Sequence, residues 1–254
     1  MRRSTLLCAG RQIEVEQEIL DMALARCDWR PFLAGGSAAL AIRRVSSISA
    51  DVAYPLEGSL APWGSYAVEG DVLLAHIPDD PFAAESVLRV AYQIVSMHQG
   101  GILLHGAGVA FADRGVAAVG PSGAGKSTLA SLCVLAGGRL LTDEVVQLFP
   151  DGSAFGTPFR SNAENVGSPG GVKLRSLLLL RKGTTERVEV LESAKALPAL
   201  MGQLFRPVPG GISPAEAFRR LGTVVDCVGV RELTFRRDPA VGGFLKDWLS
   251  RADG

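Results

Sequence analysis

Apolar and polar residues follow two different periods in the first part of the chain. Residues 12–16 alternate polar and apolar side chains, which predicts a half-buried strand. Residues 19–27 have helical spacing, and residues 38–45 predict a further strand. Strand, helix and strand in this order indicate a small α+β unit.

Proline and glycine then interrupt this pattern. Residues 54–63 are rich in both and are expected to form a loop. The apolar runs 66–68 and 72–75 flank Glu69-Gly70-Asp71, which predicts a β-hairpin. We therefore expect residues 1–78 to form a small N-terminal α+β domain and residues 79–254 to form a second, larger domain.

A long helix is predicted at the start of the second domain. Asp80 is a residue type that caps helix N-termini, and Pro81 suits the first helical position. Apolar residues then recur at helical spacing, at Phe82, Val87, Leu88, Ala91, Ile94 and Val95. His98 stands where this helix should end, and we expect it to interact with the helix end instead of taking part in catalysis.

The strands that follow predict a mixed sheet. Residues 101–105 and 107–111 are apolar enough for strands, and a turn at 113–115 leads directly into a third strand at 116–119. A tight turn makes the strands on its two sides antiparallel. Doubly wound nucleotide-binding domains instead alternate parallel strands with helices. The pattern therefore predicts an α/β domain whose sheet is mixed.

Strands and helices continue to the end of the chain. Strands are expected at 139–141, 145–149, 153–155, 176–180, 187–190 and 230–236, and helices at 128–136, 192–205, 214–226 and 239–250. Residues 156–173 are rich in Gly, Pro and Asn and predict a long loop, a feature that is often functional in a compact domain.

A glycine-rich motif lies between the strand at 116–119 and the helix at 128–136. The Walker A pattern Gly-x-x-x-x-Gly-Lys-Ser/Thr is matched at every position by Gly120, Pro121, Ser122, Gly123, Ala124, Gly125, Lys126 and Ser127, and Thr128 follows. Glycines let backbone N–H groups surround a phosphate, and the helix N-terminus adds the positive end of its dipole. Lys126 is expected to contact the β- and γ-phosphates of ATP, and Ser127 to bind Mg²⁺.

Acidic residues follow at the end of the next predicted strand. Mg²⁺ on a nucleotide needs ligands beyond the phosphates and one hydroxyl. Asp143 and Glu144 can divide this work, one holding the metal or its waters and the other accepting the proton of an attacking hydroxyl. His105 ends a strand near the loop and can support the catalytic carboxylate, although a lone histidine is often structural.

The long loop supplies two further basic candidates. Arg160 and Lys173 can contact phosphates or substrate, or can be solvated loop charges. Arg160 is taken as a nucleotide-binding candidate.

Composition narrows the classes of function. The 254 residues are 47% apolar and 20% charged with no net charge, which argues against a nucleic-acid-binding protein. No apolar run reaches the roughly 18 residues of a membrane helix, and residues 6–9 are too short an apolar run for a signal peptide. The four cysteines are scattered, which favours neither disulfides nor zinc and fits a cytoplasmic protein.

His105-Gly106, the loop Gly120–Ser127 and Thr142-Asp143-Glu144, in this order and spacing, resemble the HPr kinase/phosphorylase family. The resemblance covers about residues 81–150 and is closer to the shorter homologues, the serine kinases of peptide-modifying gene clusters such as the lasso-peptide kinases. It implies the phosphoenolpyruvate-carboxykinase-like P-loop fold and ATP- and Mg²⁺-dependent phosphorylation of a serine hydroxyl. It also implies that Asp143 is the general base, supported by His105, that Lys126 is catalytic, and that Glu144 supports the metal beside Ser127.

The chain departs from the family pattern in two respects. Its second acid is Glu144, where the family usually has Asp, and the Glu-x-Arg-Gly signature of HPr kinases has no equivalent between residues 150 and 180. The missing signature argues against phosphorylase activity and against HPr as the substrate. The hexamer of the family is not carried over, so a homo-oligomer stays an open alternative.

Two classes of function remain. The first is a kinase acting on a serine of a peptide or small protein, for example a ribosomal peptide precursor, with HPr(Ser) kinase proper as a variant. The second is a nucleotide-dependent switch or assembly ATPase without a group acceptor. The chain has no guanine-reading Asn-Lys-x-Asp motif, and Asp143 suits proton removal from an alcohol, so the kinase is favoured. Residues 156–173 and 206–211 can line an open groove, which favours a flexible peptide as the acceptor.

Overall fold

The computed structural model describes residues 2–56, 61–161 and 167–251. The chain divides into two compact units, Met1–Gln99 with Pro207–Ser213 and Gly100–Arg206 with Pro214–Gly254. The first boundary therefore falls after the long helix, whereas the sequence placed it before that helix, at residue 78. The chain also returns to the first unit for Pro207–Ser213, which no local pattern indicated.

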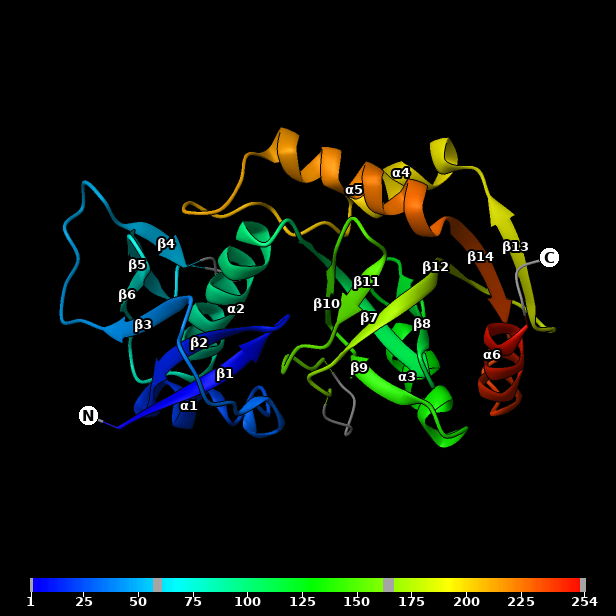
Figure 1. Cartoon of the computed structure of the whole chain (residues 1–254), viewed down its shortest axis with the longest axis horizontal. Helices are drawn as coiled ribbons and strands as arrows, with labels where there is room; N and C mark the ends of the chain where they lie inside the picture. The colour runs from blue at the N-terminus through cyan, green and yellow to red at the C-terminus, as the bar shows by residue number, and fades with distance from the viewer. Residues whose placement is uncertain (1, 57–60, 162–166, 252–254) are drawn as a thin grey trace. The chain divides into compact units, whose positions relative to one another are not determined.

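The first unit is built on a six-stranded mixed sheet in the order β1-β2-β3-β6-β5-β4 (Figure 1). Its strands are β1 (Arg3–Cys8), β2 (Arg11–Glu16), β3 (Leu40–Arg44), β4 (Tyr54–Leu56), β5 (Gly64–Glu69) and β6 (Val72–His76). Its helices are α1 (Gln17–Ala23), the short 3₁₀ helix η1 (Arg30–Phe32) and α2 (Pro81–His98). The neighbours β2–β3 and β3–β6 are parallel, and the other pairs are antiparallel.

Several sequence predictions for this unit are confirmed. The β5–β6 hairpin turns at Gly70, whose φ of +61° lies in the left-handed region. Asp80 caps α2, since its carboxylate accepts hydrogen bonds from the N–H groups of Phe82 and Ala83 at 2.8 and 3.1 Å. Two strands were not expected. β1 was overlooked because its apolar run is short, and β4 lies in the predicted loop 54–63, where residues 57–60 fall outside the described ranges.

β4 was not predicted because it contains Pro55, a residue type that is rare in strands. A proline cannot donate to a sheet ladder and is therefore confined to edge strands. β4 is the edge of this sheet and pairs only with β5, so Pro55 costs it no necessary hydrogen bond.

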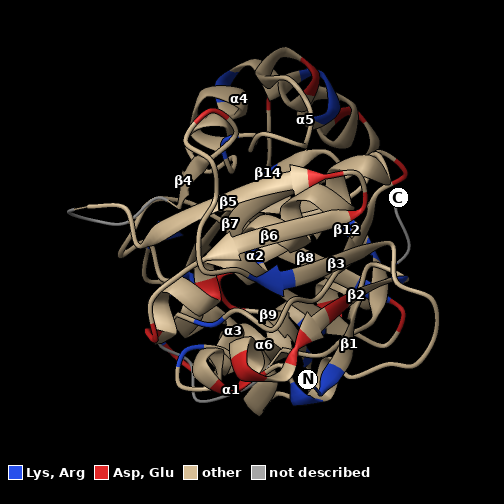
Figure 2. Ribbon diagram, turned by 90° about the vertical axis from the view of Figure 1, so that its left-hand side faces the viewer, with Lys and Arg blue, Asp and Glu red and all other residues tan. Residues whose placement is uncertain are grey.

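Charged residues of both signs are interspersed on the strands and helices visible in Figure 2. In the first unit, Glu14 of β2 pairs with Arg3 at 3.4 Å and with Arg43 of β3. Arg44 pairs with Glu18 and Asp79 at 2.7 and 2.6 Å. Ion pairs on the surface contribute little to stability, so the buried contacts between sheet and helices hold this unit together.

The second unit is built on an eight-stranded sheet in the order β11-β10-β7-β8-β12-β14-β13, with β9 also paired to β7. Its strands are β7 (Ile102–Phe111), β8 (Arg114–Val119), β9 (Arg139–Thr142), β10 (Val145–Leu148), β11 (Ser153–Phe155), β12 (Gly171–Lys182), β13 (Arg187–Leu191) and β14 (Val230–Phe235). Its helices are α3 (Lys126–Leu135), α4 (Ser193–Met201), α5 (Pro214–Val228) and α6 (Ala240–Ser250).

The prediction of a mixed sheet is confirmed. β8 is antiparallel to β7 and parallel to β12, and β12 is parallel to β14. The two predicted strands at 101–105 and 107–111 are one continuous strand, β7. The finer description as a phosphoenolpyruvate-carboxykinase-like fold stays a proposal.

Helices cover both faces of this sheet. Ala117 and Leu177 point into a core shared with α4 and α5, while their chain neighbours Ala118 and Leu178 point into a second core shared with α3 and α6. Successive residues of a strand face opposite sides of a sheet, which is why residues 115–119 of β8 and 177–180 of β12 carry no polar side chain. No helix in the described ranges is both long and apolar enough to cross a membrane.

One helix prediction in the second unit is wrong at its end. The pattern extended a helix over residues 192–205, but α4 ends at Met201. The next residues pair with β7 in place of continuing the helix. The N–H of Phe205 donates to the carbonyl of Leu103 at 3.0 Å.

Candidate functional site

β7 changes its neighbours on both sides at Gly106. On one side, the N–H of His105 donates to the carbonyl of Gln203 at 2.8 Å, and from Gly106 onward β8 takes over the pairing. On the other side, β10 pairs with β7 as far as His105, and β9 pairs with it from Gly108. The loop after β8 and the turn between β9 and β10 therefore both begin beside His105-Gly106.

Gly106 is fixed in this place by close contacts. A Cβ atom there would lie 2.8 Å from the carbonyl oxygen of Ala118, a distance that a real side chain does not tolerate. Its N–H donates to the carbonyl of Glu144 at 2.9 Å. Gly106 therefore ties the acidic turn to the strand that leads into the glycine-rich loop.

The glycine-rich loop connects the end of β8 directly to the start of α3. Gly120, Gly123 and Gly125 have φ values of +154°, +78° and +105°, which L-residues with a side chain rarely adopt. Ser122 and Gly123 are exposed, whereas Ser127 and Thr128 are half-buried in the first turn of α3. The first N–H groups of a helix have no partner within it, so this turn can donate to a phosphate.

The side chain of Lys126 folds back over the loop. Its ammonium group donates to the carbonyls of Gly120 and Pro121 at 2.7 and 3.1 Å, and the residue is only 7% exposed. Burial lowers the pKa of Lys126, and the negative charge of Glu144 acts in the opposite direction. The carboxylate of Glu144 is thus close enough to Lys126 for their charges to interact.

The turn that carries the acids is held by Thr142, the last residue of β9. Its hydroxyl accepts hydrogen bonds from the N–H groups of Glu144 and Val145 at 3.3 and 3.2 Å. The same hydroxyl contacts that of Thr157 at 3.1 Å, and Thr157 donates to the carbonyl of Val145 at 2.8 Å. Threonine hydroxyls commonly close turns in this way.

Asp143 and Glu144 differ in their access to solvent. Asp143 is 2% exposed, and its carboxylate accepts a hydrogen bond from the N–H of Ser161 at 3.1 Å. Glu144 is half-buried. A buried carboxylate with a backbone donor is well oriented, whereas a half-buried one is easier for a hydrated metal ion to reach.

Arg160 lies beside the acidic turn. Its neighbours on both sides are anchored there, since the carbonyl of Phe159 accepts from Thr142 at 3.3 Å and the N–H of Ser161 donates to Asp143. Arg160 itself is half-buried. The rest of the predicted functional loop includes residues 162–166, which lie outside the described residues.

Other candidates lie elsewhere. Lys173 pairs with Asp151 at 2.6 Å, and this hydrogen bond is the main reason that the pKa of Asp151 falls to about 2. Burial raises the pKa of Cys133 to about 12, so this thiol stays protonated in the core near neutral pH. His98 belongs to the first unit, where its ring Nε2 lies 2.9 Å from the carbonyl of Gly210.

In the described parts of the chain, no three His, Cys, Asp or Glu side chains cluster into a metal site. The predicted Mg²⁺ site would not form such a cluster, because it draws on one hydroxyl, one carboxylate and the phosphate oxygens of a nucleotide. Ser127 and Glu144 supply the hydroxyl and the carboxylate for such a site, and both residues are half-buried, so solvent and a hydrated ion can reach them.

Sequence reasoning missed three residues that position the site. They are Thr157, Ser161 and Gln203, which bind Val145, Asp143 and His105 across 12, 18 and 98 positions of the chain. Local patterns carry no signal for such contacts. Thr142 was recognisable, because a threonine directly before two acids can close the turn that presents them.

No protein-family model matches this chain, and no curated protein matches it. Among solved structures, it is similar to an HPr(Ser) kinase/phosphatase from Coxiella burnetii at 12% identity, over 57% of this chain and 91% of that one. The TM-score is 0.28. The similarity is therefore a distant structural one.

Proposed function

We propose that this protein is an ATP- and Mg²⁺-dependent kinase that transfers the γ-phosphoryl group to a serine hydroxyl of a peptide or small protein. The observation that carries the proposal is the position of the Walker A loop and the acidic turn on the two sides of His105-Gly106. A phosphate donor and a proton acceptor would then meet beside one strand.

Each residue has a distinct task in this proposal. The loop N–H groups and Lys126 hold the β- and γ-phosphates. The serine oxygen forms a bond to the γ-phosphorus as the bond to the β,γ-bridging oxygen breaks, and the hydroxyl proton passes to Asp143. The N–H of Ser161 orients the carboxylate of Asp143 for that transfer.

The remaining residues act on charge and orientation. Mg²⁺, when bound beside Ser127 and Glu144, would neutralise charge that develops on the phosphates. Arg160 is close to the acidic turn and can contribute a further positive charge. His105 lies in β7 beside the point where the Walker A loop begins. We assign it the role of supporting Asp143.

A nucleotide-dependent switch or assembly ATPase is the alternative. It shares the Walker A loop but needs no base for an alcohol. The two are separated by measuring ATP turnover with and without serine-containing peptides, together with mass spectrometry of the peptides. Phosphoserine on a peptide, with slow hydrolysis in its absence, supports the kinase. Fast hydrolysis that no acceptor changes would overturn it.

The acceptor is proposed to be a flexible peptide, such as a ribosomal peptide precursor, and a panel of compounds can test this. Serine-containing peptides, free serine and HPr protein are incubated with labelled ATP under the same conditions. Label on the peptides alone is the expected result. Label confined to free serine would contradict a peptide acceptor, and label on HPr alone would make the protein an HPr(Ser) kinase.

A further inference from the structure

A cavity in the first unit has the chemistry of a ligand site and lies outside the proposed nucleotide site. Its volume is about 280 Å³, and every residue that lines it belongs to the first unit. Ligand cavities in proteins start at about 300 Å³, so this one suits a small metabolite and not the surface of a macromolecule.

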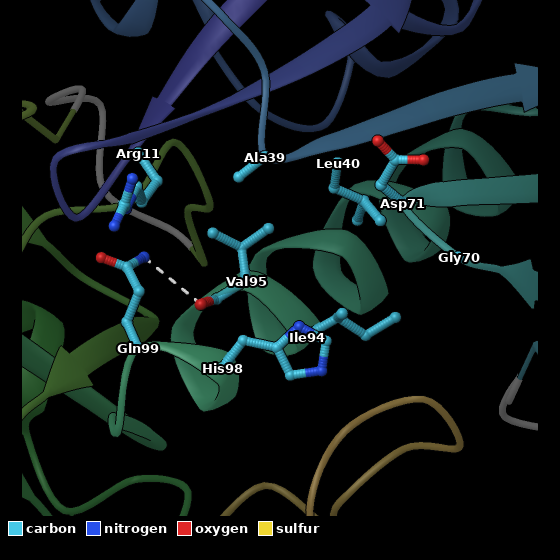
Figure 3. A pocket seen from close by; sticks show the side chains of 9 residues that line it. All are labelled: Arg11, Ala39, Leu40, Gly70, Asp71, Ile94, Val95, His98 and Gln99. Carbon is cyan, nitrogen blue, oxygen red and sulfur yellow. Dashed lines mark hydrogen bonds between the residues drawn. The ribbon is translucent and has the colours of Figure 1, made fainter.

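The cavity has opposite charges at its two ends and an apolar middle. Figure 3 shows Arg11 and Gln99 at one end and Asp71 at the other, with Ile94 and Val95 between them. Among the described residues, no hydrogen bond or ion pair is found for the side chain of Arg11 or of Asp71. Both charges are therefore available to a ligand.

Tight turns fix the positions of these charges. Arg11 follows a turn in which Ala9 and Gly10 have φ values of +46° and +82°. A left-handed conformation costs alanine about 1 kcal/mol or more, so the surrounding fold imposes this turn. Asp71 follows Gly70 in the β5–β6 hairpin, and its carbonyl accepts from the N–H of Ala41 at 2.8 Å.

The backbone beside Arg11 is fixed by Gln99. Gln99 donates through its side-chain amide to the carbonyls of Val95 and Cys8 at 3.3 and 3.5 Å. These bonds tie the end of α2 to the strand before Arg11. The backbone positions of Arg11 and Asp71 are therefore fixed, whereas their exposed side chains would become ordered when a ligand binds.

We propose that this cavity binds a small zwitterion with an apolar body, either a free amino acid or a dipeptide. Its carboxylate would pair with Arg11, whose planar guanidinium matches carboxylate geometry, and its ammonium would pair with Asp71. The apolar body would lie over Ile94 and Val95.

The chain connects this cavity to the proposed catalytic site along two routes. From His98 and Gln99 the chain continues within a few residues into β7, which carries His105. His98 also contacts Gly210 of the segment Pro207–Ser213, and that segment continues directly from the residues that pair with His105 and Leu103. Both routes are continuous stretches of chain that begin at residues of the first unit and end at residues of the second.

Calorimetry with leucine and the dipeptide Leu-Leu tests the proposal. We expect saturable binding of at least one of them, and at least tenfold weaker binding of N-acetyl-Leu-Leu and of Leu-Leu amide, because each lacks one charge. Which of the two unblocked probes binds more tightly identifies the source of the ligand.

Matched variants test whether the binding occurs in this cavity. Arg11→Gln and Asp71→Asn should each weaken binding about tenfold, since each removes a charged hydrogen-bond partner. Arg114→Gln and Asp51→Asn change exposed charges outside the cavity and should leave affinity unchanged. No saturable binding up to roughly 10 mM, equal binding of the blocked dipeptides, or equal affinity in all four variants would overturn the proposal, because a charge pair of this kind should give at least millimolar affinity.

Discussion

The two units present their candidate sites in different ways. In the second unit, the residues proposed to bind phosphate are contiguous, from Gly120 to Ser127, and the proposed binding depends mainly on backbone conformation. In the first unit, Arg11, Asp71 and Gln99 come from three separate segments, and side-chain charges would do the binding. Both sites nevertheless depend on left-handed turn residues to hold their chemistry in place.

This difference has a consequence for how each site responds to substitution. A backbone cradle is sensitive to any added side chain, because the conformation itself binds the ligand. A site made of side chains on rigid turns tolerates neighbouring changes and responds to the loss of individual charges. Substitutions can therefore break the two sites separately, and the expected effects span several orders of magnitude.

The largest effect is expected for Asp143→Asn. Asparagine keeps an oxygen that can accept from the N–H of Ser161, but it cannot take a proton from a serine hydroxyl. Phosphoryl transfer should fall roughly 10²- to 10⁴-fold while ATP affinity stays nearly the same. Steady-state transfer assays and calorimetry with ATP measure the two quantities.

His105→Ala is the companion variant to Asp143→Asn. It should lose less activity, because His105 is assigned to support the base and not to act as one. A full transfer rate in Asp143→Asn would remove Asp143 from the role of base, and a larger loss in His105→Ala would exchange the two assignments.

Lys126→Ala should reduce transfer by about a hundredfold or more, since positioning and charge supply most of the catalysis in phosphoryl transfer. The loop carbonyls of Gly120 and Pro121 also lose their donor in this variant. ATP affinity should fall with the rate. Lys246→Ala removes an exposed lysine from α6 and is the matched control, with both quantities unchanged. If Lys126→Ala had the same ATP affinity and turnover as the parent protein, the Walker A loop would have no role in catalysis.

The residues of the proposed nucleotide site could be named from the sequence, and those of the composite cavity could not. Lys126, Ser127 and the acidic pair could be named because their spacing is local, and the antiparallel β7–β8 pairing followed from the turn at 113–115. Local patterns cannot specify which distant segments meet. The cavity was therefore missed, although Gly70 and Asp71 were recognised as turn residues.

The same reason explains two errors in the secondary structure. Residues 203–205 have helical spacing, but tertiary pairing with β7 overrides that preference. β1 contains too few alternating positions to stand out, yet it pairs with β2 along its full length and is thereby stable. In both cases a neighbouring strand, and not the local sequence, decides the conformation.

A smaller effect is expected for Gly125→Ala. Gly125 has a φ of +105°, and a Cβ there would lie 3.2 Å from the ring of Phe235. The free energy of unfolding should fall by about 1–3 kcal/mol, which corresponds to a few degrees in Tm. Gly222→Ala is the control, because Gly222 lies in α5 with nothing within 4 Å of an added Cβ.

The control should move in the opposite direction. Alanine is favoured over glycine in a helix interior by about 0.5–1 kcal/mol, so Gly222→Ala should raise the free energy of unfolding. Denaturant unfolding of both variants gives the comparison. Equal stability of Gly125→Ala and the parent protein would mean that the loop can adopt another conformation, and the cradle would not be as rigid as described.

The smallest effect is expected in the segment Pro207–Ser213. Gly210 has a φ of +86°, and an added Cβ would lie 2.9 Å from Cγ2 of Val68, whereas Gly70 has a φ of +61° and open space around it. In both glycine-to-alanine variants, the left-handed backbone conformation should cost about 1–2 kcal/mol of stability. Only Gly210→Ala should also displace the segment. Hydrogen exchange at the N–H of Gly211, which donates to the carbonyl of Val208 at 2.9 Å, should then become several-fold faster in Gly210→Ala. Equal exchange rates in the two variants would mean that the contacts with Val68 and His98 do not hold this segment. The segment would then not connect the cavity to β7.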